Sequence, residues 1–401
     1  VLKRTMPGTG DELSILGYGC MRFQKRLGQV DMADVDAQMA RALEAGVNYF
    51  DTAYIYPGNE KVVGTVLGRV DEKGKRRDRV HVATKLPSML AKAPGDADRM
   101  FATSLERLGM EHVDYYLMHN LTDLAGWERL RGLGIEDFIA REKRSGRIRH
   151  IGFSWHGNLH EFRKVLDAYP WEFCQIQYNY LDENFQAGTE GLRYAASKGI
   201  GVIVMEPLRG GLLTARMPKA AAEVLDAWTK QTGVQRSPAE WGLRWVWNHP
   251  EVGLALSGMN AAAQVSENTR VASDARPDSL TDAELDVVAR VADVFRSLVK
   301  VNCTGCSYCM PCPYGVDIPL CFAFYNSFAM FGEFHAKMTY AFNTRTRGGQ
   351  RHAASACKKC GACAKKCPQH LAIPELLGDV AQTMEPPLLS AIMKLAGIII
   401  R

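Results

Sequence analysis

Residues 47–56 read VNYFDTAYIY, a short apolar run followed directly by polar and aromatic side chains. The run at 47–50 has the length and composition of a buried strand. Asp51 and Tyr56 stand where that strand would end, and the stretch after them is longer and amphipathic. The segment therefore predicts a strand, a polar loop and a helix in succession.

The same unit recurs along the first 280 residues. Eight apolar runs are predicted as strands, at residues 13–18, 47–50, 80–83, 113–118, 148–153, 173–177, 200–205 and 252–256. Residues 34–44 and 99–108 have helical spacing, and Ser237 and Thr281 begin capping boxes. Strands that alternate with helices pair in parallel, so eight units predict an α/β fold, the (β/α)8 TIM barrel. No GxGxxG follows the first strand, which argues against a Rossmann domain.

Composition and charge set limits on the function. The chain has 401 residues, 47% hydrophobic and 23% charged, with a formal net charge of +5. Its basic block at residues 73–79 is more typical of a solvated turn than of a nucleic-acid site, so we expect no nucleic-acid partner. We expect a cytoplasmic protein without a signal peptide or transmembrane segment. The apolar run at 388–400 is too short to span a bilayer and is predicted to dock on a core or a partner chain.

The cysteines divide the chain into two parts. Nine of the eleven lie after residue 300, and residues 272–280 have the composition of a connecting loop. We therefore expect a barrel domain over residues 1–280. A connecting helix, a small and mainly helical cysteine-rich domain and a tail would occupy residues 281–401. Cys20 and Cys174 fall in or beside predicted strands and are expected to be buried small hydrophobes.

Four polar side chains are expected at one end of the barrel, because active sites of this fold lie where the strands end. They are Asp51 and Tyr56 after the second strand, Lys85 in ATK after the third, and His119 in LMHN after the fourth. We expect the Lys85 ammonium, oriented by Asp51, to lower the high pKa of the Tyr56 phenol. His119 can hydrogen-bond a carbonyl oxygen. The group suits carbonyl reduction with Tyr56 as general acid.

This order of motifs resembles the catalytic tetrad of the aldo-keto reductase superfamily, with similarity over about residues 5–270. Other matching landmarks are YPGNE at 56–60, IGFS at 151–154, Gln175 in CQIQYN, Pro207-Leu208 with Gly210-Gly211, and Ser257-Gly258 with Glu267-Asn268. The resemblance implies a barrel that binds a nicotinamide cofactor and acts on a small aldehyde, ketone or sugar carbonyl. It also implies that Ser154 and Gln175 hold the carboxamide, and that residues 207–211 and 257–268 hold the phosphates and adenosine. His81, His112 and His156 match no landmark and are expected to have core or surface roles.

Two departures from the family pattern concern the cofactor. Met205 stands where an aromatic ring usually stacks on the nicotinamide. Gly258 and Gln264 stand where the family usually has basic residues for the 2′-phosphate of NADPH. The sequence therefore leaves open NADPH, NADH, or a different source of hydride or electrons.

Two cysteine runs form the second motif. NCTGCSYCMPCPYG at 302–315 has cysteines at 303, 306, 309 and 312, and CKKCGACAKKCP at 357–368 has them at 357, 360, 363 and 367. The second run has the C-x2-C-x2-C-x3-C-P spacing of bacterial [4Fe–4S] ferredoxins, in which the fourth cysteine of each run ligates the other cluster. We therefore expect two [4Fe–4S] clusters, with these ligand sets: Cys303, Cys306, Cys309 and Cys367; and Cys357, Cys360, Cys363 and Cys312.

Zinc is the alternative, because eight thiolates can also form two tetrahedral sites. The repeated three-residue spacing and the C-P endings favour iron–sulfur clusters, and a reducing compartment disfavours disulfides. Cys321 is expected to pack rather than to ligate. Residues 322–342 are rich in aromatic side chains and are predicted to be helical.

The two halves together predict an oxidoreductase. In one mechanism a nicotinamide hydride reduces the carbonyl, and the clusters are structural or connect the enzyme to an electron-carrier protein. In another, single electrons pass through the clusters and the nicotinamide is weak or absent. A third interpretation is an inactive barrel that serves as an electron-transfer or binding scaffold. Residues 120–135 and 207–235 are expected as specificity loops, and the substrate and oligomeric state stay open.

Overall fold

The computed structural model describes residues 1–26, 29–303, 305, 308–332, 334–345, 352–367 and 369–386. The chain forms two compact units. We call the first, Val1–Met217 with Glu223–Ala289, the barrel unit. We call the second, Pro218–Ala222 with Arg290–Arg401, the cysteine unit. Cys306 and the run at 388–400 lie outside the described residues.

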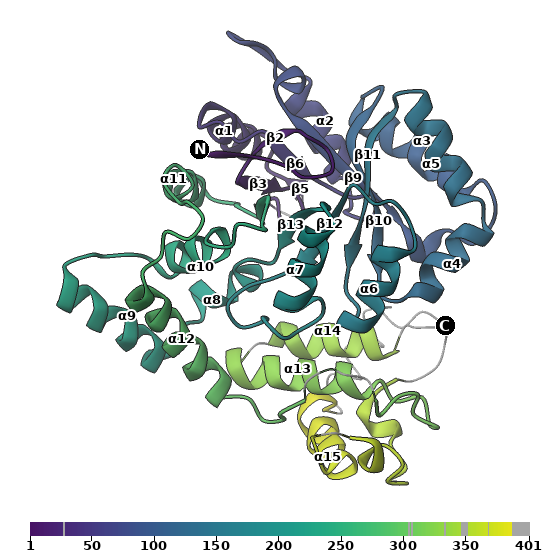
Figure 1. Cartoon of the computed structure of the whole chain (residues 1–401), viewed down its shortest axis with the longest axis vertical. Coiled ribbons are helices and arrows are strands. Elements are labelled where there is room, and N and C mark those ends of the chain that lie inside the picture. The colour runs from purple at the N-terminus through teal and green to yellow at the C-terminus, as the bar shows by residue number, and fades with distance from the viewer. Residues whose placement is uncertain are drawn as a thin grey trace. The chain divides into compact units, whose positions relative to one another are not determined.

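Eight parallel strands form the centre of the barrel unit. They close in the order β10-β11-β12-β13-β14-β3-β6-β9. Their bounds are β3 (Leu16–Gly19), β6 (Tyr49–Asp51), β9 (His81–Pro87), β10 (Val113–Leu121), β11 (Ile148–Trp155), β12 (Phe173–Gln177), β13 (Gly201–Met205) and β14 (Leu254–Ser257). Figure 1 shows helices around these strands. The predicted (β/α)8 barrel is confirmed.

Helices follow the strands in the order that the sequence predicts. They are α1 (Met32–Glu44), α2 (Asn59–Leu67), α3 (Asp96–Leu108), α4 (Leu124–Gly132), α5 (Ile135–Arg144), α6 (Leu159–Asp167), α7 (Gly188–Ser197), α8 (Leu212–Ala215), α9 (Lys219–Thr232), α10 (Pro238–Trp247) and α11 (Ala262–Val271). The expected loops at 120–135 and 207–235 therefore contain helices α4, α8 and α9. The capping box at Ser237 is confirmed, because its hydroxyl accepts a hydrogen bond from Glu240 N at 3.0 Å.

The first predicted strand is divided into two elements. Residues 13–18 were expected to be continuous, but β2 (Glu12–Ser14) pairs antiparallel with β1 (Lys3–Thr5), and the barrel strand begins only at Leu16. The reason is local. Ser14 N donates to the side chain of Asn48 at 2.7 Å, and Ser14 Oγ donates to Leu16 O at 2.8 Å. These bonds turn the chain before it enters the barrel.

Apolar side chains fill the inside of the barrel. The buried cluster consists of Met6, Leu13, Tyr49, Ala83, Tyr115, Leu117, Phe173, Ile203, Leu254 and Leu256. The barrel is therefore a packed core and not a channel, as is usual for this fold. Polar side chains that act on a ligand must lie at an end of the strands.

The cysteine unit is mainly helical. The division between the units falls within α12 (Asp282–Ser297), whose Thr281 and Glu284 form the second predicted capping box. Next come α13 (Ile318–Phe331), α14 (Phe334–Arg345) and α15 (Ile373–Met384), and α13 packs against both α14 and α15. The predicted helix over 322–342 is therefore two helices. Gly332, in the left-handed conformation at φ 63°, ends α13. In the described part of the chain, no helix is long and apolar enough to cross a membrane.

Candidate functional site

A buried ion pair lies where β6 and β9 end. Lys85 Nζ donates to the carboxylate of Asp51 and, at 2.9 Å, to Thr52 O. Lys85 is 1% exposed and Asp51 4% exposed, so neither charge reaches solvent. A buried charge is tolerated when it is paired and hydrogen-bonded. The amide of Gln175 also donates to Asp51 Oδ2, at 3.5 Å, which ties the pair to β12.

Tyr56 and His119 complete the group. Lys85 Nζ lies 5.6 Å from the centroid of the Tyr56 ring, and the Tyr56 and His119 rings meet nearly perpendicular with centroids 6.0 Å apart. His119 is buried, and among the described residues its Nδ1 has no hydrogen-bond partner. The structure thus brings together all four side chains that the sequence predicts as catalytic.

The pKa of the Tyr56 phenol differs from the expectation. Burial raises the pKa of the phenol well above its usual value, and the negative charges of Asp51 and Glu206 raise it further. Lys85 does not reverse this shift, because its ammonium is neutralised by Asp51. The expected lowering of the Tyr56 pKa by Lys85 is therefore wrong for this structure. A raised pKa keeps the phenol protonated near neutral pH, which is the state that a proton donor requires.

His119 is held in its neutral form. Burial lowers the pKa of the imidazole well below its usual value, and the positive charge of Lys85 lowers it further. A neutral imidazole keeps one ring N–H as a donor. Tyr56 and His119 together therefore offer two neutral hydrogen-bond donors at the end of the strands, beside a buried ion pair.

Two residues assigned to the nicotinamide carboxamide lie at the next strand ends. Ser154 on β11 is buried, and its Oγ accepts a hydrogen bond from Asn120 N at 2.8 Å. Gln175 on β12 is also buried, and its Oε1 has no hydrogen-bond partner among the described residues. A buried amide oxygen without a partner is costly unless a ligand satisfies it. These two side chains therefore fit a ligand that carries an amide group.

Arg22 is a candidate binding residue that the sequence analysis missed. Its guanidinium lies beside the loop after β13, with Nη1 donating to Gly210 O at 3.4 Å and Nη2 3.5 Å from Glu206 Oε1. A Cβ at Gly210 would lie 2.7 Å from Arg22 Nη2, and one at Gly258 would lie 3.5 Å from Arg22 Cδ. Arg22 thus lies between the two loops expected to hold the cofactor phosphates. It follows the first barrel strand, so the rule that strand ends carry function could have identified it.

The other expected cofactor residues lie on these same loops. Met205 ends β13 and packs, partly buried, against the barrel core, and Pro207 and Leu208 follow it. Ser257 ends β14, and its Oγ accepts a hydrogen bond from Asn268 Nδ2 at 3.0 Å. Gln264 is exposed, and its Oε1 accepts from Asn260 N at 2.9 Å. The glycines at 210 and 258 let both loops approach Arg22, whose guanidinium carries a positive charge beside them.

The cysteine unit gathers its thiols around one apolar cluster. This cluster contains Val316, Ile318, Phe322, Leu377 and Val380, and the cysteines in it or packed against it include Cys303, Cys309, Cys312, Cys357, Cys363 and Cys367. All described cysteines are free thiols. Iron–sulfur clusters are held by cysteine thiolates, so this donor set fits them. No described group of three or more Cys, His, Asp or Glu side chains is arranged to hold a single metal ion.

The two cysteine runs meet at Cys312. Burial raises the pKa of the Cys363 thiol, and the neighbouring Cys357 and Cys312 raise it further. Cys312 of the first run therefore lies near Cys363 of the second run. Cys321 is fully buried, and its Sγ lies 3.9 Å from Tyr340 Oη and 3.7 Å from His352 O. The predicted burial of Cys20 and Cys174 is confirmed, and that Cys321 packs rather than ligates stays a prediction.

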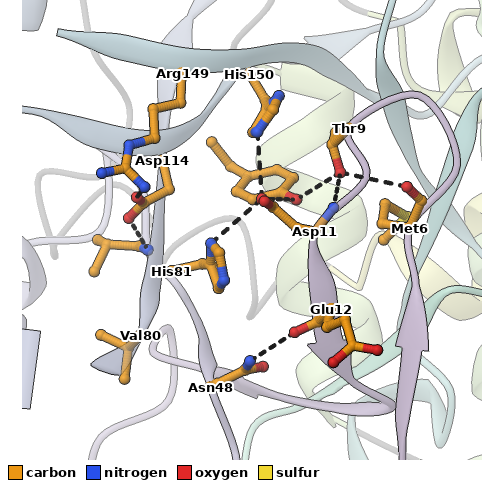
Figure 2. Close-up of polar contacts among 12 residues, drawn as sticks. Met6, Thr9, Asp11, Glu12, Asn48, Val80, His81, Asp114, Arg149 and His150 are labelled. Atoms are coloured by element: carbon orange, nitrogen blue, oxygen red, sulfur yellow. Dashed lines mark hydrogen bonds and ion pairs between the residues drawn. The ribbon is translucent and has the colours of Figure 1, made fainter. Parts of the chain in front are cut away.

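A second polar cluster lies at the opposite end of the barrel strands (Figure 2). Asp11, in the turn between β1 and β2, accepts a hydrogen bond from the Tyr115 hydroxyl at 2.8 Å. The same carboxylate oxygen lies 3.4 Å from His81 Nδ1 and 3.3 Å from His150 Nε2. These three partners come from β9, β10 and β11, near the start of each strand. We interpret these contacts as structural, because active sites of this fold lie at the other end of the strands.

His112 has a structural role near this cluster. Its Nε2 lies 3.0 Å from Arg77 Nη2 and 3.7 Å from Asp114 Oδ1. Asp114 is buried, and it also accepts a hydrogen bond from Val82 N at 2.8 Å and pairs with Arg149 at 3.2 Å. These contacts connect the beginnings of β9, β10 and β11. They bring none of these side chains to the end of the barrel that holds Tyr56 and His119.

Comparisons with known proteins agree with this geometry. The L-galactose dehydrogenase of Arabidopsis thaliana is 27% identical over 312 residues, which cover 74% of this chain and 95% of the relative. The structure of aldo-keto reductase AKR11C1 from Bacillus halodurans (holo form) is 26% identical with a TM-score of 0.57, over 72% of this chain and 96% of that one. An aldo-keto reductase from Klebsiella pneumoniae in complex with NADPH has the same fold, with 21% identity and a TM-score of 0.58 over 73% of this chain and 96% of that one.

Two family models match the chain. The model of the 4Fe-4S dicluster domain matches residues 302–372, which include both cysteine runs. The model of the aldo/keto reductase family matches residues 15–285, which include the barrel and every expected catalytic residue. The chain is therefore an oxidoreductase that belongs to the aldo/keto reductase family and carries a 4Fe-4S dicluster domain after its barrel.

Proposed function

We propose that this protein interconverts a small carbonyl compound and its alcohol, with Tyr56 as the proton donor and acceptor. The observation that carries this proposal is the contact series Asp51–Lys85–Tyr56–His119 at the ends of three neighbouring strands. Two neutral donors beside a buried ammonium suit a carbonyl oxygen on which negative charge develops. The overall reaction is carbonyl, NAD(P)H and a proton giving alcohol and NAD(P)⁺.

Each residue has a defined part in the proposed reaction. His119 donates a hydrogen bond that orients the carbonyl oxygen. Tyr56 transfers its proton to that oxygen, and the tyrosinate left behind is stabilised by Lys85, 5.6 Å from the ring. Asp51 and Thr52 O keep the ammonium in place during this transfer. Tyr56 then regains a proton from solvent.

The chain offers its own residues for a nicotinamide dinucleotide, which supplies a hydride to the carbonyl carbon when it is bound. Ser154 and the unpartnered Gln175 Oε1 would hold the carboxamide. Arg22, with the loops at 207–211 and 257–268, would hold the phosphates and adenosine. An arginine suits this position because its guanidinium can make two parallel hydrogen bonds to a phosphate.

The cysteine unit would hold two [4Fe–4S] clusters, which transfer single electrons when bound. One ligand set would be Cys303, Cys306, Cys309 and Cys367, and the other Cys357, Cys360, Cys363 and Cys312. The closeness of Cys312 to Cys363 supports this exchange of the fourth ligands. Free thiols in such number also suit a reducing compartment such as the cytoplasm.

The test is a redox assay on protein purified without oxygen. Iron, sulfide and zinc are counted, and NADPH and NADH are titrated by fluorescence. Oxidation of the nicotinamide is then followed with a panel of aldehydes and ketones, and its reduction with L-galactose, the substrate named for one relative. We expect turnover with at least one compound and its loss in Tyr56→Phe. Binding of neither nicotinamide would reject the hydride mechanism, and a colourless zinc protein would reject the clusters.

A further inference from the structure

Four exposed lysines surround the second cysteine run. Lys358 and Lys359 precede Cys360, and Lys365 and Lys366 follow Cys363. All four side chains are exposed. The eleven residues from Cys357 to Cys367 contain no acidic residue. We call these four lysines the lysine surface.

The ammonium groups of the lysine surface have no neutralising partner in the described part of the chain. Among the residues that the structure describes, none of the four pairs with a carboxylate. Many other basic side chains of the chain are paired, for example Arg244 with Glu240 at 2.8 Å and Arg236 with Glu284 at 2.5 Å. The lysine surface therefore keeps a concentrated positive field on one short loop.

The same loop exposes a cysteine. Cys363 is buried against the apolar cluster, and Cys357 is partly buried, whereas Cys360 is the exposed cysteine among those described. Lys359 has a positive φ of 53°, and its N–H donates to Cys357 Sγ at 3.4 Å. The loop thus turns two thiols towards the core of the unit, while Cys360 and the lysines face solvent. The expected cluster ligand and the positive field occur on one surface.

We propose that the lysine surface binds an acidic electron-carrier protein. The inference rests on the proposed iron–sulfur function, and it names the partner of that site. Complementary charge increases the rate of encounter and orients the partner, and a carrier must approach a cluster where it comes nearest to solvent. Among the cysteines that the structure describes, Cys360 marks that place.

Nucleic acid is the other anionic macromolecule to consider. Its binding sites combine positive charge along a groove with arginine and with aromatic side chains that stack on bases. The loop from Cys357 to Cys367 contains neither arginine nor an aromatic residue, and its charge is confined to eleven residues. The net charge of +5 is also modest for 401 residues. A compact acidic protein fits this surface better.

The experiment measures binding of two acidic probes, a flavodoxin and a plant-type [2Fe–2S] ferredoxin, by isothermal titration calorimetry without oxygen. We expect binding at low ionic strength that weakens as salt approaches about 0.15 M, because exposed charges are then screened. The variants are Lys358→Glu with Lys359→Glu, and Lys365→Glu with Lys366→Glu. Each should raise Kd by about tenfold or more.

A matched control carries the same change of charge elsewhere. Lys73 and Lys75 are exposed in and beside the hairpin of β7 (Val70–Asp71) and β8 (Gly74–Lys75), in the barrel unit. Lys73→Glu with Lys75→Glu should leave Kd nearly unchanged. An equal loss in this control would show a general charge effect and overturn the proposal.

Iron and sulfide counts separate the proposed iron–sulfur function from the proposed binding of an acidic partner. If the wild type holds neither, the proposed iron–sulfur function fails, and the partner proposal fails with it. If all variants hold as much iron and sulfide as the wild type, a change in Kd reports on the lysine surface alone. Unchanged Kd in both lysine variants, no binding of either probe, or tighter binding of a short DNA duplex at the same salt would each overturn it.

Discussion

The rings of Tyr56 and His119 lie nearly perpendicular, with their centroids 6.0 Å apart, and both side chains are uncharged near neutral pH. Removing the Tyr56 hydroxyl takes away the proposed acid while leaving the ring in place. Tyr56→Phe should lower kcat for carbonyl reduction by about 10²- to 10⁴-fold, the usual range for a general acid. Steady-state kinetics at saturating nicotinamide measure this change. Tyr54→Phe, whose ring contacts Arg107, is the control and should keep its activity. Equal loss in both variants would contradict the assignment.

The Asp51–Lys85 pair predicts a stability effect. Lys85→Met leaves the Asp51 carboxylate buried without its partner, and breaking a buried pair in this way costs about 3–5 kcal/mol. Urea unfolding of the barrel should show this loss. The double variant Asp51→Asn with Lys85→Met removes both charges and should lose less than the two single variants added together. Simple additivity would show that the two groups do not act as a pair.

Arg22 should act in cofactor binding and not in chemistry. Arg22→Gln removes the cation between the two loops at Gly210 and Gly258, so the Kd of NADPH or NADH should rise by about tenfold, or about 1.4 kcal/mol. The kcat at saturating cofactor should change little, because a ground-state contact is lost. Fluorescence titration gives the Kd. Arg26→Gln, at an exposed position nearby in the chain, is the control. An unchanged Kd in Arg22→Gln would reject the role.

Two cysteines of the cysteine unit should behave differently. Cys312→Ala removes a thiol that lies near Cys363, so iron and sulfide per chain should fall by up to about half, the share of one cluster of two. Cys321→Ala changes a buried thiol that contacts Tyr340 and should leave both counts unchanged. Chemical analysis and electron paramagnetic resonance measure the result. If Cys321→Ala lost iron and Cys312→Ala did not, the assignment of Cys312 as the ligand and Cys321 as a packing residue would be reversed.

Glu172 predicts an acid-dependent part of the stability. Burial by itself would raise its pKa, but hydrogen bonds from His150, Lys143 and Ile151 N lower it below the usual value of 4.5. A lowered pKa means that the folded state binds this proton less readily than the unfolded state. The contribution is therefore complete above about pH 4.5 and is lost as the pH falls through the folded pKa.

Glu172→Gln should therefore be less stable than the wild type at pH 7 and should lose less stability on acidification. Thermal unfolding between pH 7 and about pH 2 measures both effects, because the loss occurs below the usual pKa. Glu190→Gln, which removes an exposed partner of Arg163, should change little at either pH. A parallel pH dependence in Glu172→Gln and wild type would contradict the prediction.

Much of the site could be predicted because its signals are local. DTA, ATK and LMH each lie at the end of an apolar run, and parallel strands bring such ends to one face. Arg22 follows a barrel strand, but its contacts with Gly210, 188 residues away in the chain, and with Gly258 form only in the folded barrel. No short-range pattern reports a contact over that separation.

The errors have physical causes that the sequence pattern does not contain. Residues 13–18 have strand composition throughout, but the side chain of Asn48 bonds to Ser14 N and divides the run. Residues 322–342 are rich in aromatic side chains and were predicted as one helix, but Gly332 ends the first of two helices. The pKa of Tyr56 was predicted from one neighbouring charge, whereas the folded site adds burial and two carboxylates.

The packed interior of the barrel has a consequence for proton supply. The space between the two ends of the barrel is filled by the side chains of Tyr115, Leu117, Phe173 and Leu254. A chain of water molecules therefore cannot cross it. In the proposed reaction, the proton that leaves Tyr56 must therefore be replaced from the same end of the barrel through which substrate would enter and product would leave. Substrate exchange and re-protonation would therefore use the same entrance to the site, and a molecule that blocks this entrance would stop both.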